Sequence, residues 1–205
     1  MADNIAVKDG TGASKTLRAL DVGSGILVMV HALVDATGAD LPLMGRGIAN
    51  ASANFTRPAN TTAYTAADLV ANNTTAGSVT PLSFTVARYA LGGGRITRAF
   101  LTKSTVTTTA ATFRLHLFTA SPTVTNGDNG AFATNGLSFG VLGSLDIASM
   151  RAYGDGAFGE VFASSPGIAF KLTSGSVLYG LTEALGAYTP GNAEVFTWKL
   201  DVEQL

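Results

Sequence analysis

Short stretches in which apolar and polar residues alternate recur along most of this chain. The clearest is Thr112–Phe118, where Phe113, Leu115 and Leu117 are separated by polar or charged residues. Successive side chains of a β-strand point to opposite faces of the sheet. This segment therefore predicts a strand with one buried row and one polar row.

The segment Glu194–Val202 alternates equally well, with Phe196, Trp198, Leu200 and Val202 at every second position. An aromatic row of this kind could be mistaken for a sugar-binding platform. Because the opposite row is polar, the pattern favours a strand that buries its aromatic face in the core.

The rest of the chain also shows short alternating segments, and in no segment do apolar residues recur with the 3.6-residue period of a helix. Runs of β-branched and aromatic residues are bounded by Gly, Pro, Asn and Asp, which favours strands joined by turns. Further strands are expected at Leu82–Tyr89, Arg95–Lys103, Phe158–Phe162, Ile168–Leu172 and Val177–Leu185. The sequence thus predicts an all-β protein, either a sandwich or a barrel.

The first fifty residues differ from the remainder in holding short extended segments between Asp- and Gly-rich turns. Three such segments are Asn4–Lys8, Lys15–Leu20 and Gly25–Asp35. Two or three strands need another surface to bury one face. We therefore expect residues 1–50 to form an N-terminal β-arm or meander for subunit contact, joined through Ile48–Ala53 to a β-sandwich over residues 51–205.

Charge is sparse: 13 Lys and Arg face 14 Asp and Glu, and charged residues make up 13% of the chain against about 25% in typical soluble domains. A net charge of −1 creates no field that would hold phosphate backbones or anionic lipid. Nucleic acid and membrane surfaces are therefore poor candidate partners. A surface of Thr, Ser, Asn, Ala and Gly favours contact with other subunits.

The chain has no Cys, which excludes disulfides, thiolate nucleophiles and Cys-ligated zinc. Its N-terminus lacks the basic and apolar regions of a signal peptide. The longest apolar run, Ile26–Val34, is far shorter than the ~20 residues that cross a bilayer. We expect synthesis in the cytoplasm without processing.

The residues typical of catalysis are few. His31 and His116 both lie in apolar strand contexts, and neither has a metal-binding spacing. No G-x-S-x-G elbow occurs, and the glycines at 92–94 are followed by a strand, which favours a turn over a phosphate loop. We expect no enzyme activity, cofactor or metal; an enzyme would require Asp68, Asp128 or His116 to converge in space.

The loop Asn126–Gly130 offers side-chain oxygens in a row but only one carboxylate, that of Asp128. Calcium prefers six or more oxygen ligands, several of them carboxylates. The loop is therefore expected to be a tight turn.

Several blocks resemble proteins of tailed-bacteriophage virions. Ile5–Gly12, Lys15–Leu17 and His31–Gly38 are similar to the opening of many such proteins. The blocks that resemble capsid-associated proteins are Thr61–Asp68, Pro81–Phe84, Gly93–Ile96, Phe113–Pro122 and Asp128–Phe132. The resemblance is to head decoration, or cement, proteins. It implies a jelly-roll-like β-sandwich, commonly trimeric, that sits on the outer shell and bridges capsomers.

The resemblance carries no enzymatic residues. It implies binding to the major capsid protein lattice, with the first fifty residues reaching the capsid or a sister subunit. The candidate interface residues are Lys8, Lys15, Arg18, His31 and Arg46. Two alternatives remain open at this point: a tail or fibre-base component, and a receptor- or glycan-binding module that uses loops such as Asn72–Thr80.

Overall fold

The computed structural model describes residues 4–8, 14–21, 27–29, 47–135 and 140–204. The chain divides into two compact units, Met1–Gly45 and Arg46–Leu205. In the described part of the chain, no helix has the length and apolar character needed to cross a membrane.

The described part of the N-terminal unit is a small antiparallel sheet in the order β1-β2-β3. Its strands are β1 (Asn4–Lys8), β2 (Ser14–Asp21) and β3 (Leu27–Met29). The first two extended segments expected from the sequence are thus confirmed as strands. The third is confirmed over Leu27–Met29, and its other residues lie outside the described ranges.

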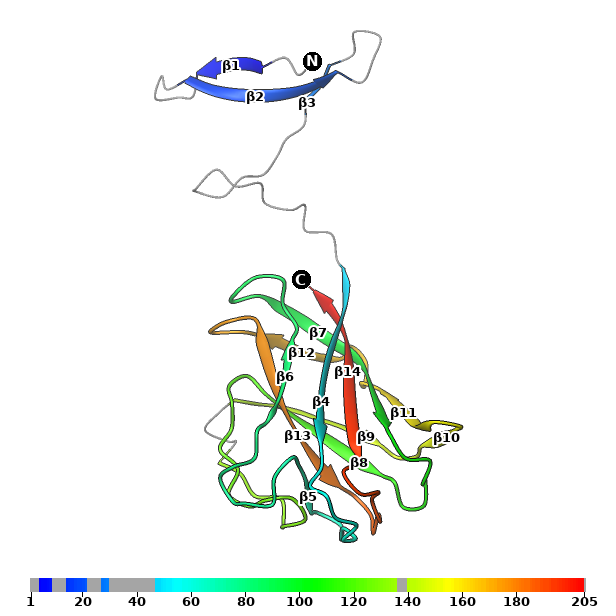
Figure 1. Cartoon of the computed structure of the whole chain (residues 1–205). Helices are drawn as coiled ribbons and strands as arrows, with labels where there is room; N and C mark the ends of the chain where they lie inside the picture. The colour runs from blue at the N-terminus through cyan, green and yellow to red at the C-terminus, as the bar shows by residue number, and fades with distance from the viewer. Residues whose placement is uncertain (1–3, 9–13, 22–26, 30–46, 136–139, 205) are drawn as a thin grey trace. The chain divides into compact units, whose positions relative to one another are not determined.

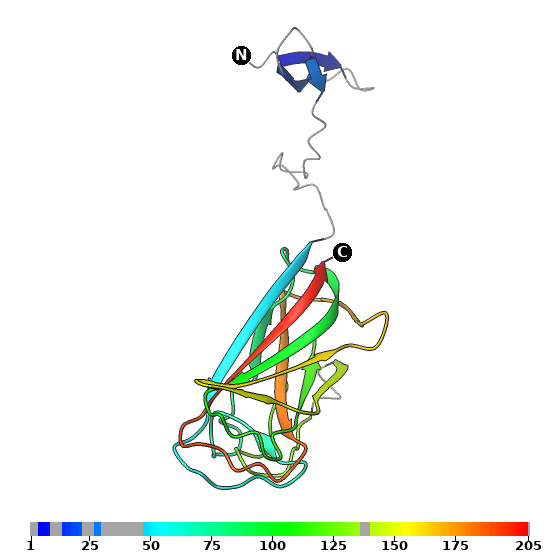
Figure 2. The same ribbon diagram turned by 90° about the vertical axis from the view of Figure 1, so that its right-hand side faces the viewer.

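The second unit is a β-sandwich of two antiparallel sheets (Figures 1 and 2). The first sheet has the order β10-β11-β7-β14-β4, with β12 also paired to β7. Its strands are β10 (Arg151–Tyr153), β11 (Gly156–Phe162), β7 (Gly93–Lys103), β14 (Val195–Gln204), β4 (Ile48–Thr56) and β12 (Ile168–Lys171).

The second sheet has the order β5-β13-β8-β9, with β6 also paired to β13. Its strands are β5 (Leu69–Val70), β13 (Val177–Ala184), β8 (Phe113–Phe118), β9 (Val141–Ile147) and β6 (Leu82–Thr85). The apolar rows of the two sheets face each other and form the main core, beside which lies a smaller buried cluster.

The aromatic row of β14 lies at the centre of this core, as its alternation predicts. Phe196, Trp198, Leu200 and Val202 are fully buried. The indole N–H of Trp198 donates a 2.9 Å hydrogen bond to Thr182 Oγ1 on β13, in the opposite sheet. That bond satisfies the one polar atom of the side chain and fixes the two layers against each other.

Two local predictions were wrong, the second of them in part. We expected Ile48–Ala53 to be a link, whereas it belongs to the nine-residue strand β4, so a boundary after residue 50 would fall within that strand. We expected the glycines at 92–94 to form a turn; Gly92 does so, since its N–H donates to the carbonyl of Tyr89 at 3.2 Å, whereas Gly93 and Gly94 begin β7. A Cβ on Gly94 would lie 2.7 Å from the carbonyl oxygen of Glu203, so close packing against β14 requires glycine there.

Candidate interaction surfaces

The residues proposed for contact fall partly in the N-terminal sheet. Lys8 is the last residue of β1 and pairs with Ser14, whereas Lys15 and Arg18 lie on β2 opposite Val7 and Asn4. His31 and Arg46 lie outside the described residues. The described strands therefore bring three of the five candidates into one small sheet.

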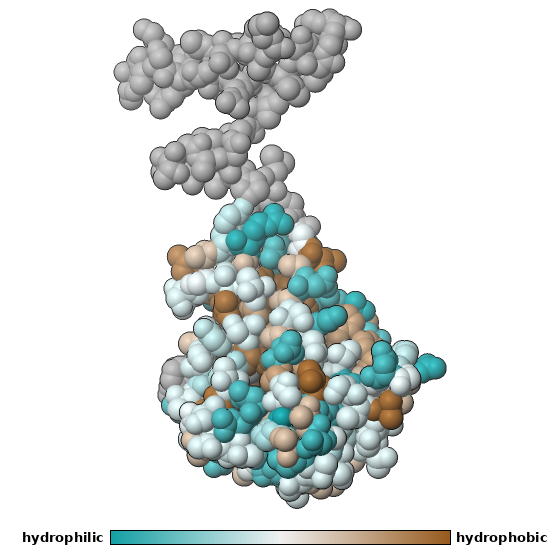
Figure 3. All heavy atoms as spheres, in the orientation of Figure 1, coloured by the Kyte–Doolittle hydropathy of each residue, from teal (hydrophilic) through white to brown (hydrophobic). Residues whose placement is uncertain are grey.

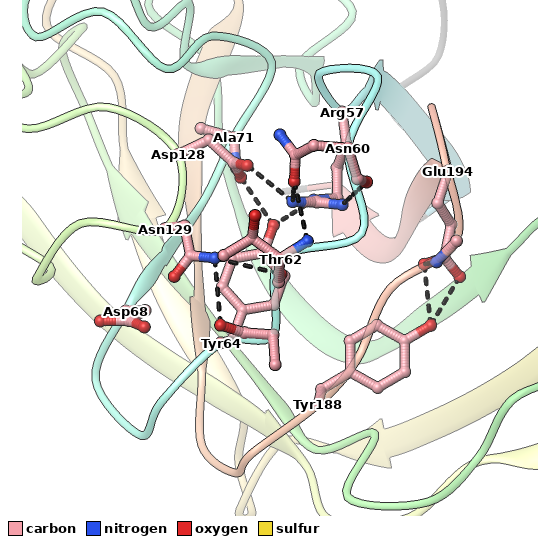
Figure 4. Close-up of polar contacts among 12 residues, drawn as sticks. Arg57, Asn60, Thr62, Tyr64, Asp68, Ala71, Asp128, Asn129, Tyr188 and Glu194 are labelled. Carbon is pink, nitrogen blue, oxygen red and sulfur yellow. Dashed lines mark hydrogen bonds and ion pairs between the residues drawn. The ribbon is translucent and has the colours of Figure 1, made fainter.

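A polar cluster is buried at one end of the sandwich, around Arg57 (Figure 4). Arg57 follows directly after β4, and its guanidinium lies 2.7 Å from Asp128 Oδ2, with both side chains fully buried. Tyr64 accepts a hydrogen bond from Arg57 Nε and donates one of 2.6 Å to Asp128 Oδ1. The backbone N–H of Ala71 donates to the same oxygen at 2.9 Å. The carboxylate of Asp128 is thus held by three donors, two from the connection between β4 and β5 and one from the residue that follows β5.

A second buried cluster surrounds Glu194, just before β14. Lys103 Nζ lies 3.2 Å from Glu194 Oε1, and both side chains are fully buried. The hydroxyl of Tyr188 lies 2.8 Å from each carboxylate oxygen, and Thr105 Oγ1 donates to Oε1. Lys103 also donates to the carbonyl of Thr105 at 3.0 Å. Both members of the ion pair therefore have hydrogen-bond partners in addition to each other.

Burial shifts the titration of these groups. Desolvation raises the pKa of Tyr64, and the nearby Asp128 carboxylate raises it further. Desolvation likewise raises the pKa of Tyr188 and lowers the pKa of Lys103, while Glu194 partly restores the charged form of the lysine. Both phenols therefore stay neutral well above the pH at which an exposed tyrosine ionises.

The two clusters are joined through the backbone. Arg57 N–H donates to the carbonyl of Glu194, and Tyr64 N–H donates to the carbonyl of Tyr188, each at 2.9 Å. In Figure 4 the side chains of Arg57, Tyr64 and Asp128 converge, and the hydroxyl of Tyr188 is directed at the carboxylate of Glu194. The arrangement fixes the connections between strands at this end of the sandwich and stabilises a rigid body.

The three residues that an enzyme would need to bring together have separate partners. Asp68 accepts hydrogen bonds from the backbone and hydroxyl of Thr65, Asp128 is held by Arg57, and His116 pairs with Glu183. In the described ranges, no group of three or more His, Asp or Glu residues is placed to hold a metal ion.

Ionic side chains also form a cluster on the outer face of the second sheet. His116 Nε2 lies 2.6 Å from Glu183 Oε2, and Arg114 holds Asp146 through two contacts of 2.7 Å. The His116 ring stacks on Phe132 with centroids 4.3 Å apart. Hydrogen bonding to Arg114 lowers the pKa of Asp146. These residues link strands β8, β13 and β9, and the stacking of His116 packs the loop that contains Phe132 against the sheet.

An uncharged groove of about 580 Å³ lies between β4 of one sheet and the start of β6 of the other. Phe55, Pro81 and Leu82 supply its apolar surface, and Asn54 and Asn72 are among its polar residues. Among the residues that the structure describes, no charged side chain lines it. The groove follows the edge at which the two sheets of the sandwich are open.

Aromatic residues on the outer face of the first sheet contact one another: the ring centroids of Phe100 and Phe158 are 5.9 Å apart, and Tyr153 meets Phe158 edge-on at 6.5 Å. Arg98 lies 4.1 Å over the ring of Phe100 and 5.4 Å from the centroid of Phe162, which is 67% exposed. In the view of Figure 3, brown spheres on the described unit appear as isolated spots among white and teal ones. The face shown there presents no single large apolar patch.

Sequence reasoning missed the partners of these clusters. Arg57 and Asp128 are 71 residues apart, and Lys103 and Glu194 are 91 residues apart. A lone Arg or Glu beside a strand gives no local signal of burial. Only the scarcity of charged residues could have suggested that some of them are paired in the interior.

No family model, curated protein or solved structure matches this chain.

Proposed function

We propose that this chain is a non-enzymatic structural protein of a tailed-bacteriophage virion, located on the capsid exterior. In this role it decorates the assembled head, binds the major capsid protein lattice and stabilises the shell by bridging capsomers. The observation that carries the proposal is the combination of a rigid sandwich, closed by buried ion pairs at one end, with a separate strand-bearing N-terminal unit.

We also propose that the sandwich is a jelly roll. In that topology a long antiparallel hairpin is rolled up, so that the first strand pairs with the last, the second with the seventh, and so on inward. The pairs β4·β14, β6·β13, β7·β11 and β8·β9 follow this order. Jelly rolls are common among viral capsid domains and lectins, so the topology supports a virion role without specifying it.

The physical basis of cementing is mass action. A protein that binds the assembled lattice, but not its separate subunits, lowers the free energy of the assembled state. Such binding benefits from a preformed body and from strands that add to a neighbour's sheet. The small sheet β1-β2-β3 supplies strands of that kind, and Lys8, Lys15 and Arg18 lie on them.

The test is a density map of the tailed-phage particle whose genome encodes this chain. We expect the sandwich on the outer surface of the head, in many copies that contact the major capsid protein. Density in the tail or at the fibre base would replace the head assignment with the first alternative. A particle that lacks the chain altogether would overturn the proposal.

A glycan-binding module is a second candidate because the groove between β4 and β6 has the composition of a sugar site. Its lining includes one aromatic residue, Phe55, and the amide or hydroxyl residues Asn54, Asn72 and Thr80. A glycan array probed with the full chain tests this role, and replacing Asn54 and Asn72 by Ala should abolish any signal. Absence of binding across the array removes this candidate.

A further inference from the structure

The strand β4 is the last strand at one side of the first sheet. In the described ranges, its only strand partner is β14, which runs beside it from Ile48 to Thr56 without a register shift. Just outside the strand, Gly47 accepts from Gln204 and Arg57 donates to Glu194, so the odd-numbered residues direct their backbone groups at β14. By alternation, the even-numbered residues present their N–H and C=O groups to the free edge.

This edge lacks the protection that soluble proteins usually provide. Exposed edge strands are commonly short, charged, bulged or interrupted by proline. In contrast, β4 is nine residues long and contains no charged residue and no proline. Its first residue, Ile48, is 78% exposed. Unprotected edges of this length pair with other strands.

The sequence of β4 is complementary to itself in the antiparallel direction. Residues 50–54 read Asn-Ala-Ser-Ala-Asn from either end, with Ser52 at the centre. In an antiparallel pair centred on Ser52, each Asn50 faces Asn54 of the other copy and each Ile48 faces Thr56. Every even-numbered residue then joins a hydrogen-bonded pair, which matches the backbone groups that the free edge presents.

The side chains agree with this register. Ile48, Asn50, Ser52, Asn54 and Thr56 form the exposed row of β4, whereas the inward row consists of Ala49, Ala51, Ala53 and Phe55. Asn50 Nδ2 donates to Asp201 on β14, so in the paired register its Oδ1 accepts from the Asn54 amide of the other copy. The two Ser52 hydroxyls hydrogen-bond across the strands, and the Thr56 methyl group covers part of Ile48. Because β4 is uncharged, the pairing opposes no like charges.

We propose that β4 is a self-association edge, through which a second copy of this chain adds antiparallel across a two-fold axis at Ser52. Such an isologous contact joins copies in pairs and extends the first sheet across both molecules. It does not depend on the capsid role, and it differs from the contact that a trimer would use.

The first test replaces Ser52 by cysteine in the full chain, which otherwise has none. Facing Cα atoms of a hydrogen-bonded pair lie about 5.5 Å apart, within the range that a disulfide spans. With dioxygen and a copper–phenanthroline catalyst, two thiols lose two protons and two electrons and form one disulfide. Ser174→Cys is the matched control, since Ser174 is an exposed serine outside the strands.

We expect most of the S52C protein to migrate as a linked dimer on a non-reducing gel, and most of the S174C protein to remain unlinked. Equal linkage in the two variants would overturn the proposal.

The second test is Ser52→Lys, which places two cations opposite each other at the two-fold axis. Light scattering should show twice the chain mass for the wild-type protein and for Ser174→Lys, and a halved mass for S52K. Circular dichroism confirms that each variant is folded. An S52K mass equal to that of the wild-type protein would overturn the assignment of β4.

Discussion

At the residue scale, the buried ion pair Arg57–Asp128 is expected to contribute strongly to the free energy of unfolding. Each partner compensates a charge that has no access to water, and Tyr64 and Ala71 complete the hydrogen bonding of the carboxylate. Removing one partner of such a pair leaves an unpaired charge in the interior, which is more costly than replacing both.

We therefore expect Asp128→Ala to lower the free energy of unfolding by about 3–5 kcal/mol. The double substitution Arg57→Met with Asp128→Leu should lose less, because no buried charge is left. Guanidinium chloride denaturation measures both values. The control is Asp155→Ala, at an exposed position, which should change stability by less than about 0.5 kcal/mol. A D128A variant as stable as D155A would contradict this account.

A second prediction concerns the loss of stability at alkaline pH, and it follows from the buried phenols of Tyr64 and Tyr188. Burial raises the pKa of Tyr64 and Tyr188, whereas in the unfolded chain each ionises near pH 10. Their neutral forms thus contribute stability below about pH 10 that is lost as the pH rises. The ionisation of these two residues should coincide with unfolding.

Tyrosinate absorbance at 295 nm and far-UV circular dichroism, recorded in one titration, test this coincidence. The double variant Tyr64→Phe with Tyr188→Phe should lack the part of the absorbance rise that accompanies unfolding. Ionisation of all five tyrosines while the β signal stays native would show that the two phenols are accessible.

At the element scale, β7 depends on a glycine for its approach to β14 and β12. A Cβ on Gly94 would lie 2.7 Å from Glu203 O and 2.9 Å from the ring of Phe170. We expect Gly94→Ala to cost about 1–3 kcal/mol through overpacking. Gly154→Ala is the matched control, because nothing lies within 4 Å of its added Cβ. Thermal melts that shift equally for both variants would be inconsistent with this close contact.

How well each strand could be predicted follows from its side chains. The strands β8 and β14 carry large apolar residues at every second position, so alternation alone predicts both the strand and its buried face. In β4 the inward row is mostly alanine and the outward row mostly Asn and Ser, which provides little contrast in hydropathy. Its position beside β14, which supplies the large residues, is a tertiary effect that no local pattern contains.

The buried clusters were beyond prediction for a different reason. Asp128 lies in a loop whose composition correctly suggested turn chemistry, and Asn129 has the left-handed φ of 64° that such turns use. The carboxylate of Asp128, however, pairs with Arg57, which lies 71 residues earlier in the chain. Which loops meet at one end of a sandwich depends on the order of all its strands.

At the scale of the whole molecule, the described core residues of the sandwich pack against one another within their own unit. Its buried apolar residues all lie between Ala51 and Val202, and they form two clusters made by strands and loops of the sandwich alone. The two buried ion pairs likewise join residues of this unit only. Removal of residues 1–45 therefore leaves every residue of these clusters in the chain.

We expect a chain of residues 46–205 to unfold in one cooperative transition, with a midpoint within a few degrees of that of the corresponding transition in the full chain. Differential scanning calorimetry measures both proteins, and the far-UV spectrum reports whether the β structure persists. The same truncated chain should fail to decorate capsids if the strands of residues 4–29 make the contact. A truncated chain that melts at a much lower temperature would show that the N-terminal unit stabilises the sandwich. A truncated chain that is stable and still decorates capsids would place the capsid contact on the sandwich itself.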